Sequence, residues 1–123
     1  MPKGKIEHAN ITVTDPERSV RLFEVLLDWH ERWRGPSAMG GRTIHVGERT
    51  TYLAIYTNDA AAGGYAKGAP LNHIGLLVDD LDAAEQVVIS HGLEPFNHGD
   101  YEPGRRFYFF DWDGIEFEVV SYE

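Results

Sequence analysis

Two segments of the chain alternate between apolar and polar residues and resemble each other. Residues 6–13 read IEHANITV and residues 71–78 read LNHIGLLV, with a histidine third in each. Because successive side chains of a strand face opposite sides, the apolar residues of each segment share one face and the histidine lies on the other. The pattern therefore predicts two equivalent strands that carry His8 and His73 on their polar faces.

A helix is expected after each of these strands. In the first copy Asp15 is placed to cap the helix and Pro16 to start it, and an apolar face follows. In the second copy Asp80 or Asp82 is the capping residue, and Gly92 ends the helix.

Three short strands are expected after each helix, so each half of the chain reads β-α-β-β-β. Their predicted bounds are 31–34, 42–46 and 52–56 in the first half, and 94–97, 106–110 and 115–120 in the second. Residues 58–70 join the halves, and their Gly/Ala-rich middle favours a loop over a strand, which could serve as a lid. We expect one α+β domain over residues 1–123, with repeat one at about 5–57 and repeat two at about 71–122.

The last predicted strand places two carboxylates on the polar face. Ile115, Phe117 and Val119 must face the helices, so Glu116 and Glu118 lie on the other side, the side of the histidines. When the two halves are matched, Ala54 is the residue of the first half that corresponds to Glu118.

Other polar and aromatic positions share or avoid this face by the same alternation. Tyr108 is expected on the same strand face as Arg106 and Phe110, and to point inward. Its expected counterpart in the first half is Ile44. His45 is expected on the opposite face in a structural role. The candidates for pocket walls, with ordinary sheet packing as the alternative, are Asn10, Tyr52 and Tyr56.

Composition narrows the class of protein. The chain has 123 residues, of which 42% are hydrophobic and 25% charged, as in an ordinary globular domain. A net charge of −9 opposes binding to nucleic acid or an anionic membrane. The absence of cysteine excludes thiolate metal sites and a cysteine nucleophile. With no long apolar segment and no leader pattern, we expect a cytoplasmic protein whose partner is a small-molecule substrate.

The paired repeat, its two strand histidines and the last hairpin together resemble the vicinal oxygen chelate superfamily. That hairpin reads DWDG over residues 111–114 and IEFE over residues 115–118. The family includes glyoxalase I, bleomycin-binding proteins, fosfomycin-resistance thiol transferases and extradiol dioxygenases. The resemblance implies a curled mixed sheet around a divalent metal, with the helices on its outer face. It also implies His8, His73 and Glu118 as the metal ligands, and a homodimer.

The resemblance further implies an open metal site. Ala54 stands where the glyoxalase branch would place a fourth side-chain ligand, and alanine cannot ligate. Two imidazoles and one carboxylate remain, a set that suits Fe(II) in an oxygenase and also Mn(II). Tyr108 is similar to the tyrosine that dioxygenases use beside the metal, and His98 is similar to their acid–base histidine.

The leading functional expectation is therefore a dioxygenase-like enzyme that acts on a catechol-type substrate with adjacent oxygens. A glyoxalase-type lyase or a fosfomycin-type thiol transferase is the alternative within the family. A metal-free drug-binding protein is the alternative from another class, because the acidic chain and the aromatics Trp33, Tyr52 and Tyr56 would suit a cationic ligand.

Overall fold

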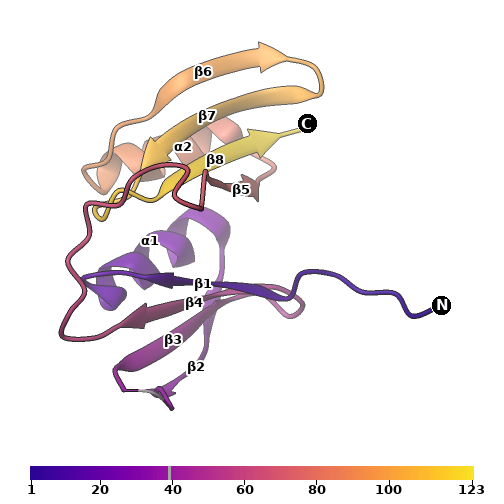
Figure 1. The fold of residues 1–123 in the computed structure, drawn as a ribbon. Coiled ribbons are helices and arrows are strands. Elements are labelled where there is room, and N and C mark those ends of the chain that lie inside the picture. Colours follow the sequence, from indigo (N-terminus) through magenta and orange to yellow (C-terminus); the bar gives the residue numbers. More distant parts are fainter. Residues whose placement is uncertain (39) are drawn as a thin grey trace. The chain divides into compact units, whose positions relative to one another are not determined.

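The computed structural model describes residues 1–38 and 40–123 (Figure 1). These residues form two compact units, Met1–Ala62 and Gly63–Glu123. Each unit holds one β-α-β-β-β repeat, so the predicted α+β class and its two repeats are confirmed. The first unit consists of β1 (His8–Thr12), α1 (Pro16–Leu27), β2 (His30–Pro36), β3 (Arg42–Gly47) and β4 (Tyr52–Thr57). The second consists of β5 (Ile74–Leu77), α2 (Leu81–Ser90), β6 (Phe96–Tyr101), β7 (Gly104–Phe110) and β8 (Glu116–Ser121).

Both repeats build the same four-stranded mixed sheet. The strand order is β1-β4-β3-β2 in the first unit and β5-β8-β7-β6 in the second. In each sheet the first strand pairs in parallel with the last, and the remaining pairs are antiparallel. Asn10 lies opposite Ala54 in the first sheet, and Gly75 lies opposite Glu118 in the second. The match of Ala54 to Glu118 between the repeats is therefore correct.

The helices begin where their capping residues predict. Asp15 accepts a hydrogen bond from the backbone N–H of Arg18 at 3.1 Å, and Pro16 is the first residue of α1. In the second unit the cap is Asp80, which accepts from Ala83 N at 3.0 Å. These carboxylates satisfy backbone N–H groups that have no partner within the helix.

One face of each sheet is covered by the helix of the same unit. α1 packs on β3 and β4, and α2 packs on β7 and β8. Phe109 and Phe117 stack at 5.3 Å between ring centroids in the second unit, and both are fully buried. Among the described residues, neither helix is long and apolar enough to cross a membrane. The apolar residues thus gather under the helices and leave polar residues for the opposite sheet face.

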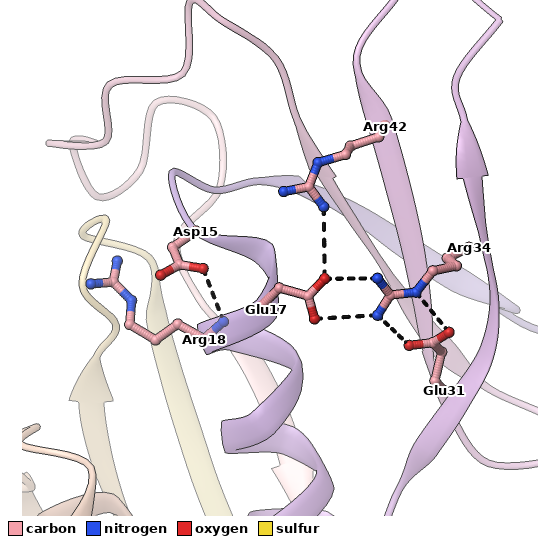
Figure 2. A network of polar contacts seen from close by, with 6 residues as sticks. All are labelled: Asp15, Glu17, Arg18, Glu31, Arg34 and Arg42. Atoms are coloured by element: carbon pink, nitrogen blue, oxygen red, sulfur yellow. Dashed lines mark hydrogen bonds and ion pairs between the residues drawn. The ribbon is translucent and has the colours of Figure 1, made fainter.

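An ion-pair network ties the first turn of α1 to the sheet of the first unit (Figure 2). Arg34 of β2 contacts both carboxylate oxygens of Glu17 at 2.7 and 3.2 Å, and it contacts both oxygens of Glu31 at 2.6 and 2.9 Å. The hydrogen bonds from Arg34 lower the pKa of Glu17. Arg42 of β3 lies 3.9 Å from the same carboxylate. The Glu17 carboxylate therefore links the start of the helix to two neighbouring strands, to β2 through Arg34 and to β3 through Arg42.

Strand β6 lies further along the chain than the pattern predicted. It spans 96–101 rather than 94–97, and it pairs with β7 through a register shift between Phe96 and Gly99. Asn97 at this shift has a φ of 51°. The run Asn-His-Gly-Asp offers no apolar alternation, so its strand conformation depends on pairing with β7 and was not visible in the sequence.

The turn between β7 and β8 buries a carboxylate. Asp111 accepts hydrogen bonds from the backbone N–H groups of Asp113 and Ile115, each at 2.9 Å. Burial nevertheless raises the pKa of Asp111 to about 6. Tyr65 of the linker donates its backbone N–H to Asp113 O at 3.0 Å, so this part of the expected lid is fixed against the turn. Gly114 has a φ of 94°, which favours glycine, and a Cβ there would lie only 3.0 Å from the Tyr65 backbone.

Replacement of Asp111 by asparagine should change the pH dependence of stability. The raised pKa means that folding favours the protonated form, so this contribution is complete below about pH 4 and is lost as the pH rises through the folded-state value. The amide oxygen of the introduced asparagine can accept the same two hydrogen bonds without a charge. Relative to wild type, Asp111→Asn should gain about 1–3 kcal/mol of unfolding free energy between about pH 4 and about pH 7.

Urea unfolding at a series of pH values measures this effect, with the exposed Asp59→Asn as the control. Stability curves of wild type and Asp111→Asn that run parallel across the whole range would contradict it.

Candidate functional site

His73 and Glu118 meet on the polar face of the second sheet. Glu118 lies in β8 opposite Gly75 of β5, and its carboxylate reaches His73, which precedes that strand. His73 Nε2 lies 3.2 Å from Glu118 Oε1. Two ligands about 2.1 Å from one ion and at right angles to each other are about 3 Å apart, so this donor pair fits a divalent metal.

The second oxygen of Glu118 is held by two neighbours from β7. Arg106 Nη1 donates to Oε2 at 2.9 Å, and the Tyr108 hydroxyl donates to the same atom at 3.1 Å. Arg106 is further fixed by the carbonyl of Gly104 and by the Tyr101 ring, whose centroid is 4.9 Å from its Cζ. Burial, followed by the hydrogen bond to Glu118, raises the pKa of Tyr108. These contacts turn Oε1 toward His73 and keep the Tyr108 phenol protonated.

Glu116 places a second carboxylate on this face, almost fully buried. Its side chain is 2% exposed, and Lys67 Nζ lies 2.7 Å from Oε2. Among the described residues this oxygen accepts no hydrogen bond of regular geometry, so the contact is an ion pair. His73 Nδ1 is 3.8 Å away. Lys67 comes from the linker, which therefore supplies the cation that stabilises the buried charge.

Four of these residues, Lys67, His73, Tyr108 and Glu116, border a cavity of about 360 Å³ within the second unit. The cavity is large enough for a small substrate and is lined mostly by polar groups. Its lining residues are Lys67, His73, Asn97, His98, Tyr101, Tyr108 and Glu116.

The first unit carries a stack of rings on the corresponding face. His8 lies opposite Tyr52 in the sheet, and their rings stack at 4.8 Å between centroids. His45 stacks on Tyr52 at 4.5 Å and contacts Trp33 at 5.0 Å. Arg32 Cζ lies 4.4 Å from the centroid of the Tyr52 ring. Tyr52 therefore packs among imidazole and guanidinium groups rather than lining an open wall.

The remaining first-unit candidates lie on the same face. Asn10 and Ala54 are directly opposite each other, and Thr12 pairs with Tyr56. The Tyr56 hydroxyl donates to Gly40 O at 3.0 Å. Ala54 is buried and offers no ligating atom.

The expected position of His45 is wrong. His45 pairs with Ala54 as Tyr108 pairs with Glu118, so His45, and not Ile44, is the counterpart of Tyr108 and lies on the same face as Ala54. Ile44 is fully buried in the core. Burial, and then the charges of His8 and Arg32, lower the pKa of His45. The apolar residues Ile44 and Val46 on either side of His45 indicated that His45 faces away from the core. The repeats were matched with an offset wrong by one residue in this strand, so the indication was missed.

The two other candidates on the second sheet differ in their surroundings. His98 lies in β6 rather than in a loop, and its Nε2 is 2.8 Å from Glu85 of α2. The β6 residue opposite Tyr108 is Phe96. The imidazole of His98 thus pairs with a helix carboxylate, and its catalytic role stays a prediction. Phe110 shares the face of Tyr108 as expected, is 42% exposed, and stacks on Phe96 at 5.2 Å.

In the part of the chain that the structure describes, no three His, Asp or Glu side chains gather so as to hold a metal ion. His73 and Glu118 form a pair within the second unit, and His8 belongs to the first. The sequence analysis overlooked Lys67, because a lysine in a Gly/Ala-rich linker shows no periodicity that would assign it to a site. It also overlooked Tyr101, since β6 was expected to end before it.

Comparison with known proteins gave a family and a fold. The model of the Glyoxalase/Bleomycin resistance protein/Dioxygenase superfamily matches residues 5–119. A search of curated protein sequences found no match. A glyoxylase/bleomycin resistance protein/dioxygenase domain from Frankia sp. EAN1pec shares 22% identity, with 98% of each chain covered and a TM-score of 0.84.

Two fosfomycin resistance proteins are also similar in structure. FosX from Mesorhizobium loti shares 27% identity, with 98% of this chain and 92% of that chain covered and a TM-score of 0.74. FosX from Listeria monocytogenes, solved with Mn(II) and sulfate, shares 18% identity, with coverage of 98% and 93% and a TM-score of 0.75.

The buried pair of Lys67 and Glu116 yields a stability prediction. Lys67→Met should cost about 1–3 kcal/mol of unfolding free energy, because it leaves a buried carboxylate without a partner. Adding Glu116→Gln in the same chain removes the charge and should recover most of that loss. Chemical denaturation of the wild type, both single variants and the double variant measures the coupling. Additive effects of the two substitutions would contradict the ion pair.

Proposed function

The chain belongs to the Glyoxalase/Bleomycin resistance protein/Dioxygenase superfamily, and we propose that it is a divalent-metal-dependent enzyme for small substrates with two adjacent oxygens. The observation that carries the proposal is the contact of 3.2 Å between Glu118 Oε1 and the Nε2 atom of His73, a residue that lines the cavity. An imidazole nitrogen and a carboxylate oxygen are common ligands of Fe(II) and Mn(II).

The proposed ligands are His73 and Glu118 from the second repeat and His8 from the first. His8 is included because it is the counterpart of His73 in the first repeat and because it matches the ligand pattern of the superfamily. The ion, when bound, supplies a Lewis acid that two neighbouring substrate oxygens can chelate. Fe(II) or Mn(II) is the proposed metal, and the Listeria FosX structure with Mn(II) supports the second choice.

Tyr108 is the proposed acid–base residue. Its hydroxyl lies 3.1 Å from the proposed ligand Glu118, and the residue lines the cavity that a substrate would enter. Arg106 holds the same carboxylate and adds a positive charge beside it. Tyr108 lines the cavity, so a substrate oxygen that enters the cavity can exchange a proton with its hydroxyl.

The first proposed reaction is ring opening of a catechol with O₂. Position 54 offers no fourth ligand, so the proposed three-ligand set leaves room for both substrate oxygens and for O₂. Tyr108 provides one proton-transfer group beside the ligand Glu118.

Opening of an epoxide on an anionic substrate is the second candidate. Lys67 and Arg106 are paired with the carboxylates of Glu116 and Glu118, so these four charges balance. A divalent ion bound there would leave a net positive charge, which favours a negatively charged substrate. Lys67 adds a positive charge that the sequence analysis had not counted. The likeness to FosX proteins, one solved with Mn(II) and 1S,2S-dihydroxypropylphosphonic acid, points in the same direction.

Metal binding is the first test. Calorimetric titration with Mn(II), or with Fe(II) under anaerobic conditions, should show about one site per chain. His73→Ala and Glu118→Gln should each weaken binding by at least about 10-fold, because each removes a ligand. His30→Ala, which changes an exposed histidine outside the site, should bind as wild type does. Equal affinity of wild type and His73→Ala would contradict the ligand assignment.

The reaction class is the second test. The reduced Fe(II) protein should consume O₂ with a catechol, and Tyr108→Phe should lower turnover by about 10²-fold, the usual effect of losing one acid–base group. Tyr122→Phe, at an exposed position, should leave turnover unchanged. No oxygen uptake across a catechol panel, together with Mn(II)-dependent opening of an epoxide phosphonate, would reject ring cleavage in favour of the second candidate.

A further inference from the structure

Each proposed metal-binding histidine is hydrogen-bonded to the side chain of the residue immediately before it. Asn72 Oδ1 lies 2.7 Å from His73 Nδ1, and Glu7 Oε1 lies 3.0 Å from His8 Nδ1. The two pairs occupy equivalent places, at the entry to the first strand of each sheet. The same contact therefore occurs once in each repeat, with a different residue as the partner.

Both partners present an oxygen that accepts. A carboxylate is an acceptor only, and the Asn72 atom facing the ring is the amide oxygen. A neutral imidazole carries one N–H, so an acceptor at Nδ1 selects the tautomer that is protonated there. In that tautomer Nε2 carries a lone pair and no hydrogen.

This tautomer changes the meaning of the contact between His73 and Glu118. An unprotonated Nε2 and the carboxylate Oε1, 3.2 Å apart, are two acceptors that face each other without a hydrogen between them. Such a pair is stabilised by a cation that binds both lone pairs. With the opposite tautomer, the same atoms would form an ordinary hydrogen bond and compete with the ion.

Glu116 is the other oxygen near the ring, but it is too far away to set the tautomer. Its Oε2 lies 3.8 Å from His73 Nδ1, beyond hydrogen-bonding distance, and it is paired with Lys67. Asn72 is thus the acceptor that fixes His73. In the first unit Glu7 also accepts from the Tyr52 hydroxyl at 3.4 Å, which further restrains its carboxylate beside His8.

We propose that Asn72 and Glu7 are positioning residues that hold His73 and His8 in the tautomer with a free Nε2, ready to bind the metal. The inference rests on the proposed function for the role of the metal, but the hydrogen bonds exist without it. Loss of such a partner lowers metal affinity by about 10–100-fold in other metal sites.

The tautomers can be measured directly on the full chain without metal. Long-range ¹H–¹⁵N correlation spectra of ¹⁵N-histidine-labelled protein, recorded over a series of pH values, distinguish the two neutral tautomers from each other and from the doubly protonated ring. Wild type should show His73 and His8 protonated at Nδ1. Asn72→Leu should shift His73 toward protonation at Nε2 and leave His8 unchanged, whereas Asn72→Asp keeps an acceptor oxygen and should restore the wild-type pattern.

Mn(II) affinity provides the second measurement. Asn72→Leu should bind Mn(II) about 10–100-fold more weakly than wild type, and Asn72→Asp should recover the affinity. A wild-type His73 protonated at Nε2, or a tautomer unaffected by Asn72→Leu, would overturn the inference. If wild type shows the expected tautomers but binds no Mn(II), the proposed function fails while the assignment of the two hydrogen bonds stands.

Discussion

The alternation of β8 is the constraint on which the site of the second unit depends. Phe117 and Val119 are fully buried on the side of α2, so Glu116 and Glu118 must lie on the opposite face. One carboxylate is nearly inaccessible and the other is largely so, and charge removed from water needs a partner. The partners are Lys67 for Glu116, and Arg106 and His73 for Glu118. The same contacts bring the proposed metal ligands His73 and Glu118 together.

The two repeats share one backbone plan but differ at the positions that face the site. Where the second repeat has Glu116, Glu118 and Tyr108, the first has Tyr52, Ala54 and His45. Carboxylates in one repeat are thus replaced by rings and a methyl group in the other. The first sheet consequently carries an aromatic stack around His8, while the second carries the charged groups. This difference explains how a duplicated fold can supply unlike parts to one function without a change in topology.

Local patterns were enough to predict the framework. The capping residues Asp15 and Asp80, the parity of Glu118 with His73, and the order of elements in each repeat all depend on neighbours close in sequence or on strict alternation. The error at His45 came from a repeat match displaced by one residue, whereas the other failures depended on distant partners. β6 becomes a strand only by pairing with β7, and Lys67 is recognised as part of the site only by its contact with Glu116. None of these contacts leaves a periodic signal along the chain.

The central claim is that His73 Nε2 and Glu118 Oε1 bind the same divalent ion. Pulsed electron paramagnetic resonance of the Mn(II)-loaded protein tests it directly, because nitrogen bound to manganese modulates the electron spin echo. We predict nitrogen modulation from coordinated imidazole that weakens in His73→Ala and changes frequency when the histidines are labelled with ¹⁵N. A bound Mn(II) signal with no imidazole nitrogen coupling, or one identical in wild type and His73→Ala, would contradict the account.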